Sequence, residues 1–145
     1  MKVQSIRKDW ELIQKLVEEN KKIIDVGCGS GELLKRLKNN KGAETRGLEI
    51  DGDLVREAIA NGLSVVQGNA ETDLFQYGES SFDYVILSQT LQAMHNPKEV
   101  LDQMLKIGSK VIVSFPNFGH WKIRLKLFLD GKMPVTKDLP FAWYE

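Results

Sequence analysis

The chain has 145 residues, of which 42% are apolar and 28% charged, so it can bury the core of one domain spanning residues 1–145. Basic and acidic residues number 20 each, and this zero net charge argues against a nucleic-acid-binding protein, which usually carries a basic excess. The single cysteine, Cys28, excludes an internal disulfide, and we see neither a signal peptide nor an apolar run long enough to span a membrane. A cytoplasmic protein without membrane contact is therefore expected, and the zero net charge is compatible with a homo-oligomer.

The first part of the chain predicts a helix, a strand and a glycine-rich turn. Apolar residues recur at helical spacing over residues 5–19, which predicts a helix that covers the sheet; the alternative is a flap over a ligand site. The run KKIIDVGCGSG at 21–31 then predicts a buried parallel strand over 22–26, a turn with glycines at 27, 29 and 31, and a helix over 31–37. Such a turn points backbone N–H groups at a ligand and lets the ligand approach the backbone closely.

Strands and helices alternate through the rest of the chain. The further predicted strands are 45–50, 63–67, 82–87 and 111–115, and the further predicted helices are 54–61, 97–108 and a short basic helix at 122–129. Asp53 is expected to cap the helix at 54–61, residues 68–71 to form a polar turn, and Asn96 with Glu99 to form a capping box. The links are too long for hairpins, so the pattern predicts a doubly wound, mostly parallel α/β sheet.

Polar side chains follow the ends of several predicted strands. Ligands of open α/β sheets bind beyond the C-terminal ends of the strands, at the switch point of the strand order. The glycine turn lies at that edge, and so do Glu49, Asn69 and Ser88 at the ends of the second, third and fourth strands. The sequence therefore predicts that these groups converge on one crevice.

Two ligands were weighed for this crevice. A dinucleotide fingerprint, G-x-G-x-x-G, would require a third glycine where Glu32 stands, and the chain is too short for a second mononucleotide-binding half. The pattern D-x-G-x-G-x-G, which begins at Asp25, instead resembles the first motif of class I methyltransferases and points to S-adenosylmethionine. That resemblance makes Glu49 the ribose-binding acid, with Ile50 on the adenine face and Asn69 on the adenine edge. The predicted cofactor-binding residues are Asp25, Gly27, Cys28, Gly29, Gly31, Glu49, Ile50, Asn69, Ala70 and Ser88.

Each of these assignments has a structural alternative. The glycines would also suit a tight turn without a ligand, Glu49 a solvated strand end, and Asn69 an ordinary turn. The thiol of Cys28 is expected to be a small packing group within the turn.

A catalytic constellation is not evident in the sequence. Methyl transfer from a sulfonium depends more on alignment than on a base, so its absence does not exclude that reaction. His95 and His120, which follow the fourth and fifth strands, are the candidate proton acceptors. The N/D-P-P-Y signature of amino methyltransferases is absent, and two histidines and one cysteine at wide spacing predict no metal site. The basic helix at 122–129 is either a solvated face or a contact for an acidic partner.

Four stretches give a narrower resemblance: IIDVGCGSGELL at 23–34, GLEID at 47–51, LSQTLQAMHNP at 87–97, and SFPNFGHWKIRLKLFLDGKMPVTKDLPFAWYE at 114–145. Together they closely resemble the MetW family of methionine biosynthesis proteins, in the class I methyltransferase-like superfamily, over nearly the whole chain. The resemblance implies a Rossmann-like fold, S-adenosylmethionine binding, and action with, or regulation of, a homoserine O-acyltransferase. The alternative it leaves open is an active methyltransferase on an unidentified small molecule. Class I methyltransferases have seven strands, so the five predicted here suggest a C-terminally truncated domain lacking the last two.

Overall fold

The computed structural model describes residues 7–117, 119, 124–125, 128–129 and 131. A single sheet has parallel pairings throughout and the strand order β3-β2-β1-β4-β5. Its strands are β1 (Lys22–Val26), β2 (Glu44–Glu49), β3 (Val65–Gln67), β4 (Phe82–Ser88) and β5 (Gly108–Ser114). The order reverses between β1 and β4, so the doubly wound α/β prediction is confirmed and the switch point lies beside the end of β1.

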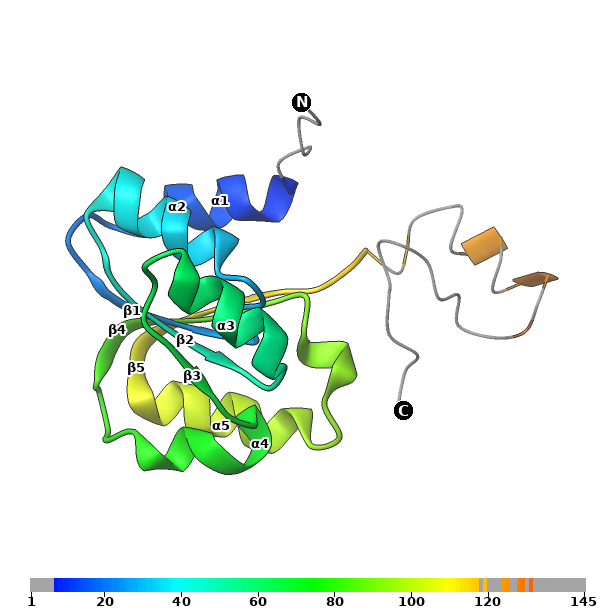
Figure 1. Cartoon of the computed structure of the whole chain (residues 1–145). Helices are drawn as coiled ribbons and strands as arrows, with labels where there is room; N and C mark the ends of the chain where they lie inside the picture. The colour runs from blue at the N-terminus through cyan, green and yellow to red at the C-terminus, as the bar shows by residue number, and fades with distance from the viewer. Residues whose placement is uncertain (1–6, 118, 120–123, 126–127, 130, 132–145) are drawn as a thin grey trace.

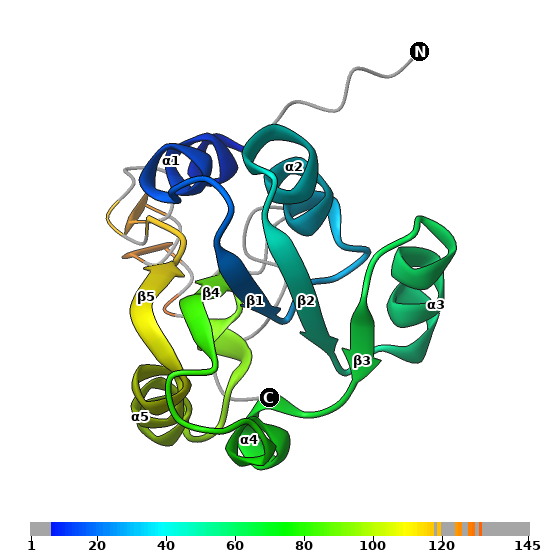
Figure 2. The ribbon, with the colours of Figure 1, turned by 90° about the vertical axis from the view of Figure 1, so that its left-hand side faces the viewer.

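Helices cover both faces of this sheet (Figures 1 and 2). One face carries α1 (Lys8–Leu16), α2 (Glu32–Lys41) and α3 (Gly52–Ala60); the other carries α4 (Ala70–Asp73) and α5 (Pro97–Ile107). Two short 3₁₀ turns, η1 (Leu74–Gln76) and η2 (Leu91–Ala93), precede β4 and α5. The result is a three-layer α/β/α arrangement.

Alternation along β1 decides which side chains face which layer. Ile24 and Val26 join the core beneath α5, whereas Ile23 joins the core beneath α1 and α2. Because successive strand residues point to opposite faces, Asp25 lies on the same face as Ile23, under the α1 layer. Ile13 of α1 is 2% exposed and sits in that core, which confirms the prediction of a covering helix.

Several local predictions were wrong for identifiable reasons. The cap of α3 is Asp51, not Asp53, because its carboxylate accepts the N–H groups of residues 53 and 54. The polar turn expected at 68–71 contains the start of α4, which Asn69 caps by accepting the N–H of Glu71 at 2.9 Å. Asn96 makes no side-chain cap, so the capping box with Glu99 does not form.

α5 ends at Ile107 with Gly108 as its C-cap, so the predicted helix end is confirmed, but β5 begins at Gly108 itself, three residues earlier than predicted. Gly108 has extended rather than left-handed backbone angles and already pairs with Phe82 in β4. A Cβ at this position would lie 2.3 Å from Cγ2 of Val85. Gly108 therefore ends α5 as predicted, and its close approach to β4 is a further reason for a glycine at this position. The basic helix predicted at 122–129 lies largely outside the described residues.

Candidate functional site

Two glycines of the turn between β1 and α2 differ in the space around them. Gly31 has φ +83°, and a Cβ there would lie 2.3 Å from Cδ1 of Leu63, so helix packing requires it. Gly29 has φ +57° and open space around its Cβ position. The turn is thus packed tightly against the protein at Gly31 but is open to an approaching molecule at Gly29.

Glu49 closes the turn from the end of the neighbouring strand. Its two carboxylate oxygens accept the backbone N–H of Gly29 at 2.7 Å and that of Asp51 at 3.0 Å. The side chain is 8% exposed and lies at the C-terminal edge of the sheet. A carboxylate has about four acceptor positions, so each oxygen can still accept one hydroxyl from a ligand. The predicted proximity of Glu49 and the glycine turn is confirmed.

Asp25, the next-to-last residue of β1, is buried near the same edge of the sheet, and we call its surroundings, with Glu49 and Asp9, the floor of the candidate site. Asp25 is 2% exposed, and its Oδ1 has no hydrogen-bond partner among the described residues. Burial, aided by the nearby charges of Glu49 and Asp9, raises the pKa of Asp25 to about 8 although Arg7 opposes the shift. A carboxyl group held in this way is neutral at neutral pH until a cation joins it.

A hydrogen-bonded cluster that the sequence analysis missed lies above this floor, at the start of α1. Arg7 Nη2 donates to the Ser88 hydroxyl at 2.8 Å, and Arg7 Nε donates to Asp9 at 3.0 Å. Asp9 Oδ2 accepts the hydroxyls of Ser88 and Ser114, each at 3.0 Å. The cluster ties the start of α1 to the ends of β4 and β5. Ser88 therefore lies at the predicted edge, but its hydroxyl is already engaged with α1.

The loop after β4 supplies a second residue that was missed. A Cβ at Gly27, where φ is +73°, would lie 2.8 Å from Cγ2 of Thr90. The Thr90 hydroxyl donates to the carbonyl oxygen of Ser88 at 3.0 Å, which holds its side chain against the turn. The chain carries no local signal for this contact, since 63 positions separate the two residues.

The remaining predicted residues line the rim or support it. Ile50 is 64% exposed directly after Glu49, which leaves an apolar surface at the end of β2. Asn69 and Ala70 follow β3, where Asn69 uses its side-chain oxygen as a cap and Ala70 packs against the core. Cys28 is buried in the cluster beneath α2 and α3, and burial with the nearby Asp25 and Glu49 raises the pKa of its thiol. Its role as a packing residue is confirmed.

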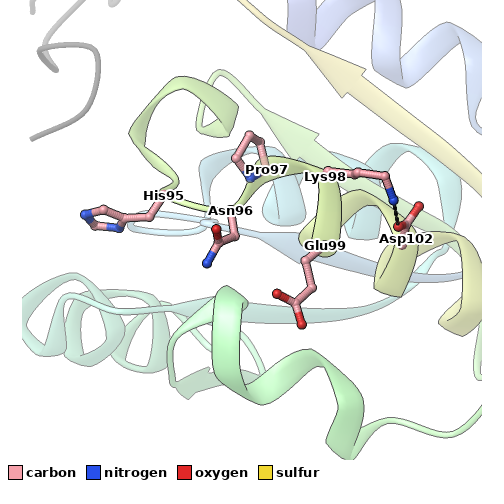
Figure 3. A pocket seen from close by; sticks show the side chains of 6 residues that line it. All are labelled: His95, Asn96, Pro97, Lys98, Glu99 and Asp102. Atoms are coloured by element: carbon pink, nitrogen blue, oxygen red, sulfur yellow. Dashed lines mark hydrogen bonds and ion pairs between the residues drawn. The ribbon is translucent and has the colours of Figure 1, made fainter.

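His95 lies two residues before the start of α5 (Figure 3). Its Nδ1 lies 3.2 Å from one oxygen of Glu71, whose other oxygen accepts the N–H of Asn96 at 2.6 Å. An open depression of about 450 Å³ here is lined by residues 95–99 and 102, and His95 points away from the Lys98–Asp102 ion pair. None of the glycine-turn residues lines this depression.

The other candidate histidine, His120, lies outside the described residues. Within the described part of the chain, no group of three or more acidic, histidine or cysteine side chains is placed to hold a metal. Nor does that part contain a helix of the length and apolarity needed to cross a membrane.

The sheet order is that of Rossmann-like folds, and solved methyltransferase structures share the fold of this chain. A SAM-dependent methyltransferase from Archaeoglobus fulgidus matches with TM-score 0.68 and 21% identity, over 88% of this chain and 63% of that one. A SAM-dependent methyltransferase from Thermotoga maritima, described as a possible histamine N-methyltransferase, matches with TM-score 0.69 and 20% identity, over 93% of this chain and 63% of its own. At this level of identity, the likeness establishes the fold.

The sequence identifies the family within that class. The family of methionine biosynthesis protein MetW matches residues 7–145, and the chain belongs to it. A curated relative from Rhodopirellula baltica, the bifunctional methionine biosynthesis protein MetXA/MetW, is 30% identical over 94% of this chain. The chain spans 23% of that relative's length.

Proposed function

We propose that this chain is an S-adenosylmethionine-binding domain of methionine biosynthesis that acts with a homoserine O-acyltransferase. The observation that carries the partner assignment is the Rhodopirellula relative, whose name joins MetXA and MetW in one bifunctional protein. Fusion of two activities in one chain favours their association when they are separate. The chain's own match covers only the MetW portion of such an arrangement.

Cofactor binding is supported by how the edge of the sheet is built. Glu49 keeps acceptor capacity for two ribose hydroxyls while the N–H groups of Gly29 and Asp51 fix its orientation. The open space at Gly29 admits a ligand to the backbone, and the orphaned oxygen of Asp25 suits a cationic group. The Glu49 carboxylate fits a ribose, and the Asp25 carboxyl fits a positively charged amino acid portion joined to that ribose.

Each predicted contact keeps a defined role in this proposal. Glu49 binds the ribose, Ile50 packs on the adenine, and the Asn69 amide with the backbone of Ala70 meets the adenine edge. Asp25 faces the cationic portion of the ligand. The glycine turn, with glycines at 27, 29 and 31 around Cys28, lies along the ligand, and Ser88 holds α1 over the crevice.

S-adenosylmethionine supplies an electrophilic methyl group when it is bound. The protein's part in any transfer is to orient that group and exclude water, and neither task needs a strong base. His95, bonded to Glu71, is the described candidate for accepting a proton from an acceptor molecule. The bifunctional relative makes the acyltransferase partnership the better supported role.

Calorimetric titration with S-adenosylmethionine tests the cofactor assignment, with Glu49→Gln as the variant. Glutamine keeps one acceptor oxygen and loses the other, so binding should weaken about 10- to 100-fold, since one hydrogen bond to a charged group contributes roughly 1.5–3 kcal/mol. Glu44→Gln is the matched control, because Glu44 is exposed at the opposite end of the same strand. Undiminished binding by Glu49→Gln would remove Glu49 from the site, and no binding by the unmutated protein would refute the cofactor assignment.

Acyltransferase assays test the partner assignment and separate it from methyl transfer. The homoserine O-acyltransferase is assayed alone, with this protein, and with this protein plus S-adenosylmethionine. A change in rate with co-purification supports the proposal, whereas an unchanged rate and no association overturn it. Release of S-adenosylhomocysteine in the presence of candidate metabolites would instead favour the methyltransferase alternative.

A further inference from the structure

The floor of the candidate site carries an excess of acidic groups. Glu49 and Asp9 lie close enough to Asp25 to act with burial in raising its pKa, and Arg7 is the nearby cation that opposes them. Asp25 and Glu49 are 2% and 8% exposed, so solvent screens them weakly. With both carboxyl groups and Asp9 ionised, the four side chains carry a net charge of two negative units.

Within this group of four side chains, Asp25 carries an oxygen, Oδ1, for which the described residues supply no hydrogen-bond partner. Arg7 is directed elsewhere, since its described bonds go to Asp9 and Ser88. The hydroxyls of Ser88 and Ser114 are also used by Asp9, and the buried thiol of Cys28 donates to the Gly29 carbonyl oxygen at 3.7 Å. Among the described residues, Oδ1 of Asp25 is left without a hydrogen-bond partner at the centre of this arrangement.

We propose that this acidic floor makes the site select the sulfonium S-adenosylmethionine over its neutral counterpart S-adenosylhomocysteine, with Asp25 as the residue that determines the preference. The inference rests on the proposed cofactor function. The two ligands share the adenosine and the amino acid group, and they differ in one methyl and one positive charge. Glu49 serves both through the ribose, so it does not distinguish them. A domain with this preference responds to S-adenosylmethionine itself and not to the combined pool of both compounds.

Binding of the cation is coupled to loss of a proton. Burial raises the pKa of Asp25 to about 8, so the empty site holds this carboxyl protonated at pH 7. A cation placed on the floor favours the ionised form, and the proton passes to the buffer. If only the ionised form binds the sulfonium well, apparent affinity falls about tenfold between pH 9 and pH 7.

The test compares three ligands against three proteins by calorimetry. The ligands are S-adenosylmethionine, S-adenosylhomocysteine and sinefungin, in which an amine replaces the sulfonium. The proteins are the unmutated chain, Asp25→Asn, and Asp53→Asn, which makes the same charge change on an exposed side chain of α3. We expect the unmutated chain and Asp53→Asn to bind both cations about 10- to 100-fold more tightly than S-adenosylhomocysteine. In Asp25→Asn that ratio should fall to within about threefold of unity.

Proton release gives a second readout that does not depend on a variant. Titration of the unmutated chain at pH 7 in buffers of different ionisation enthalpy should show close to one proton released with S-adenosylmethionine beyond any release seen with S-adenosylhomocysteine. The amine of the ligands titrates in the same range, so the homocysteine compound supplies the baseline. Equal affinities for the three ligands, or equal proton release, would overturn this inference while leaving cofactor binding in place. Failure of all three to bind would instead refute the proposed function.

Discussion

We predict that the Asp25 carboxyl lowers the free energy of unfolding of the ligand-free protein. Replacing it with asparagine should restore part of this free energy. The difference between a pKa of about 8 and the ordinary 3.8 corresponds to a penalty of up to about 6 kcal/mol above pH 8. The penalty is absent below about pH 4, where both folded and unfolded chains hold the proton, and it grows by about 1.4 kcal/mol for each pH unit in between.

Asparagine keeps the shape of Asp25 and removes the charge. It also buries an amide whose hydrogen bonds are not all satisfied, which offsets part of the gain by about 1–3 kcal/mol. We therefore expect Asp25→Asn to raise the free energy of unfolding at pH 8 by about 2–4 kcal/mol, or the melting temperature by roughly 6–12 °C for a domain of this size.

Thermal unfolding of both proteins at pH 5, 7 and 9 measures this effect. The advantage of Asp25→Asn should be small at pH 5, larger at pH 7 and largest at pH 9, because folding the unmutated chain opposes ionisation of this group. Asp53→Asn, with an exposed side chain, should show no such pH trend. An advantage that is the same at all three pH values, or a loss of stability at pH 9, would refute the reasoning from burial.

Three further predictions concern the residues around the site. Gly31→Ala should lower the free energy of unfolding, measured in urea, by about 2–4 kcal/mol, because Gly31 has a left-handed φ and its Cβ would lie 2.3 Å from Leu63. Gly62 also has a left-handed φ but lies in open space, so Gly62→Ala should lower it by only about 1–2 kcal/mol. Equal losses in the two variants would contradict this prediction. Burial acts to raise the pKa of Asp9, but its hydrogen bonds, led by the one from Arg7, outweigh burial and hold that pKa low. Asp9→Asn should therefore lower the free energy of unfolding by about 1–2 kcal/mol above pH 4. This loss should vanish as pH falls below about 3. Glu71→Ala should speed hydrogen exchange of the amide N–H that its carboxylate accepts, whereas Glu79→Ala should leave that exchange unchanged.

The strands and the site edge were predictable because their signals are local. Lys22–Val26 was predicted with its observed bounds, since a short apolar run before a glycine turn has few other interpretations. The convergence of Glu49 with the turn followed from strand order alone, because parallel strands present their C-terminal ends at one edge. Element boundaries that depend on which of two acids caps a helix, as at Asp51 and Asp53, were less well predicted.

The rest of the site could not be read from the sequence because its signals are long-range. Arg7 immediately precedes α1 and Asp9 lies in its first turn, where charged residues are usually solvated, yet both contact Ser88, and Asp9 also contacts Ser114. The helix start at Asn96 was expected to use Glu99, three residues away, but Glu71 from α4 takes that role. Tertiary packing overrode the local pattern in both cases.

Packing and backbone geometry alone do not explain every feature of the glycine turn between β1 and α2. Gly31 and Gly27 are accounted for by packing against Leu63 and Thr90, so a tight turn without a ligand would keep them. Such a turn gives no reason for an open approach at Gly29, and it would gain stability by losing the buried, unpaired carboxyl of Asp25. Stability given up at a buried polar group is characteristic of ligand sites. These two features support the proposal that the turn is half of a binding site and not only a connection between a strand and a helix.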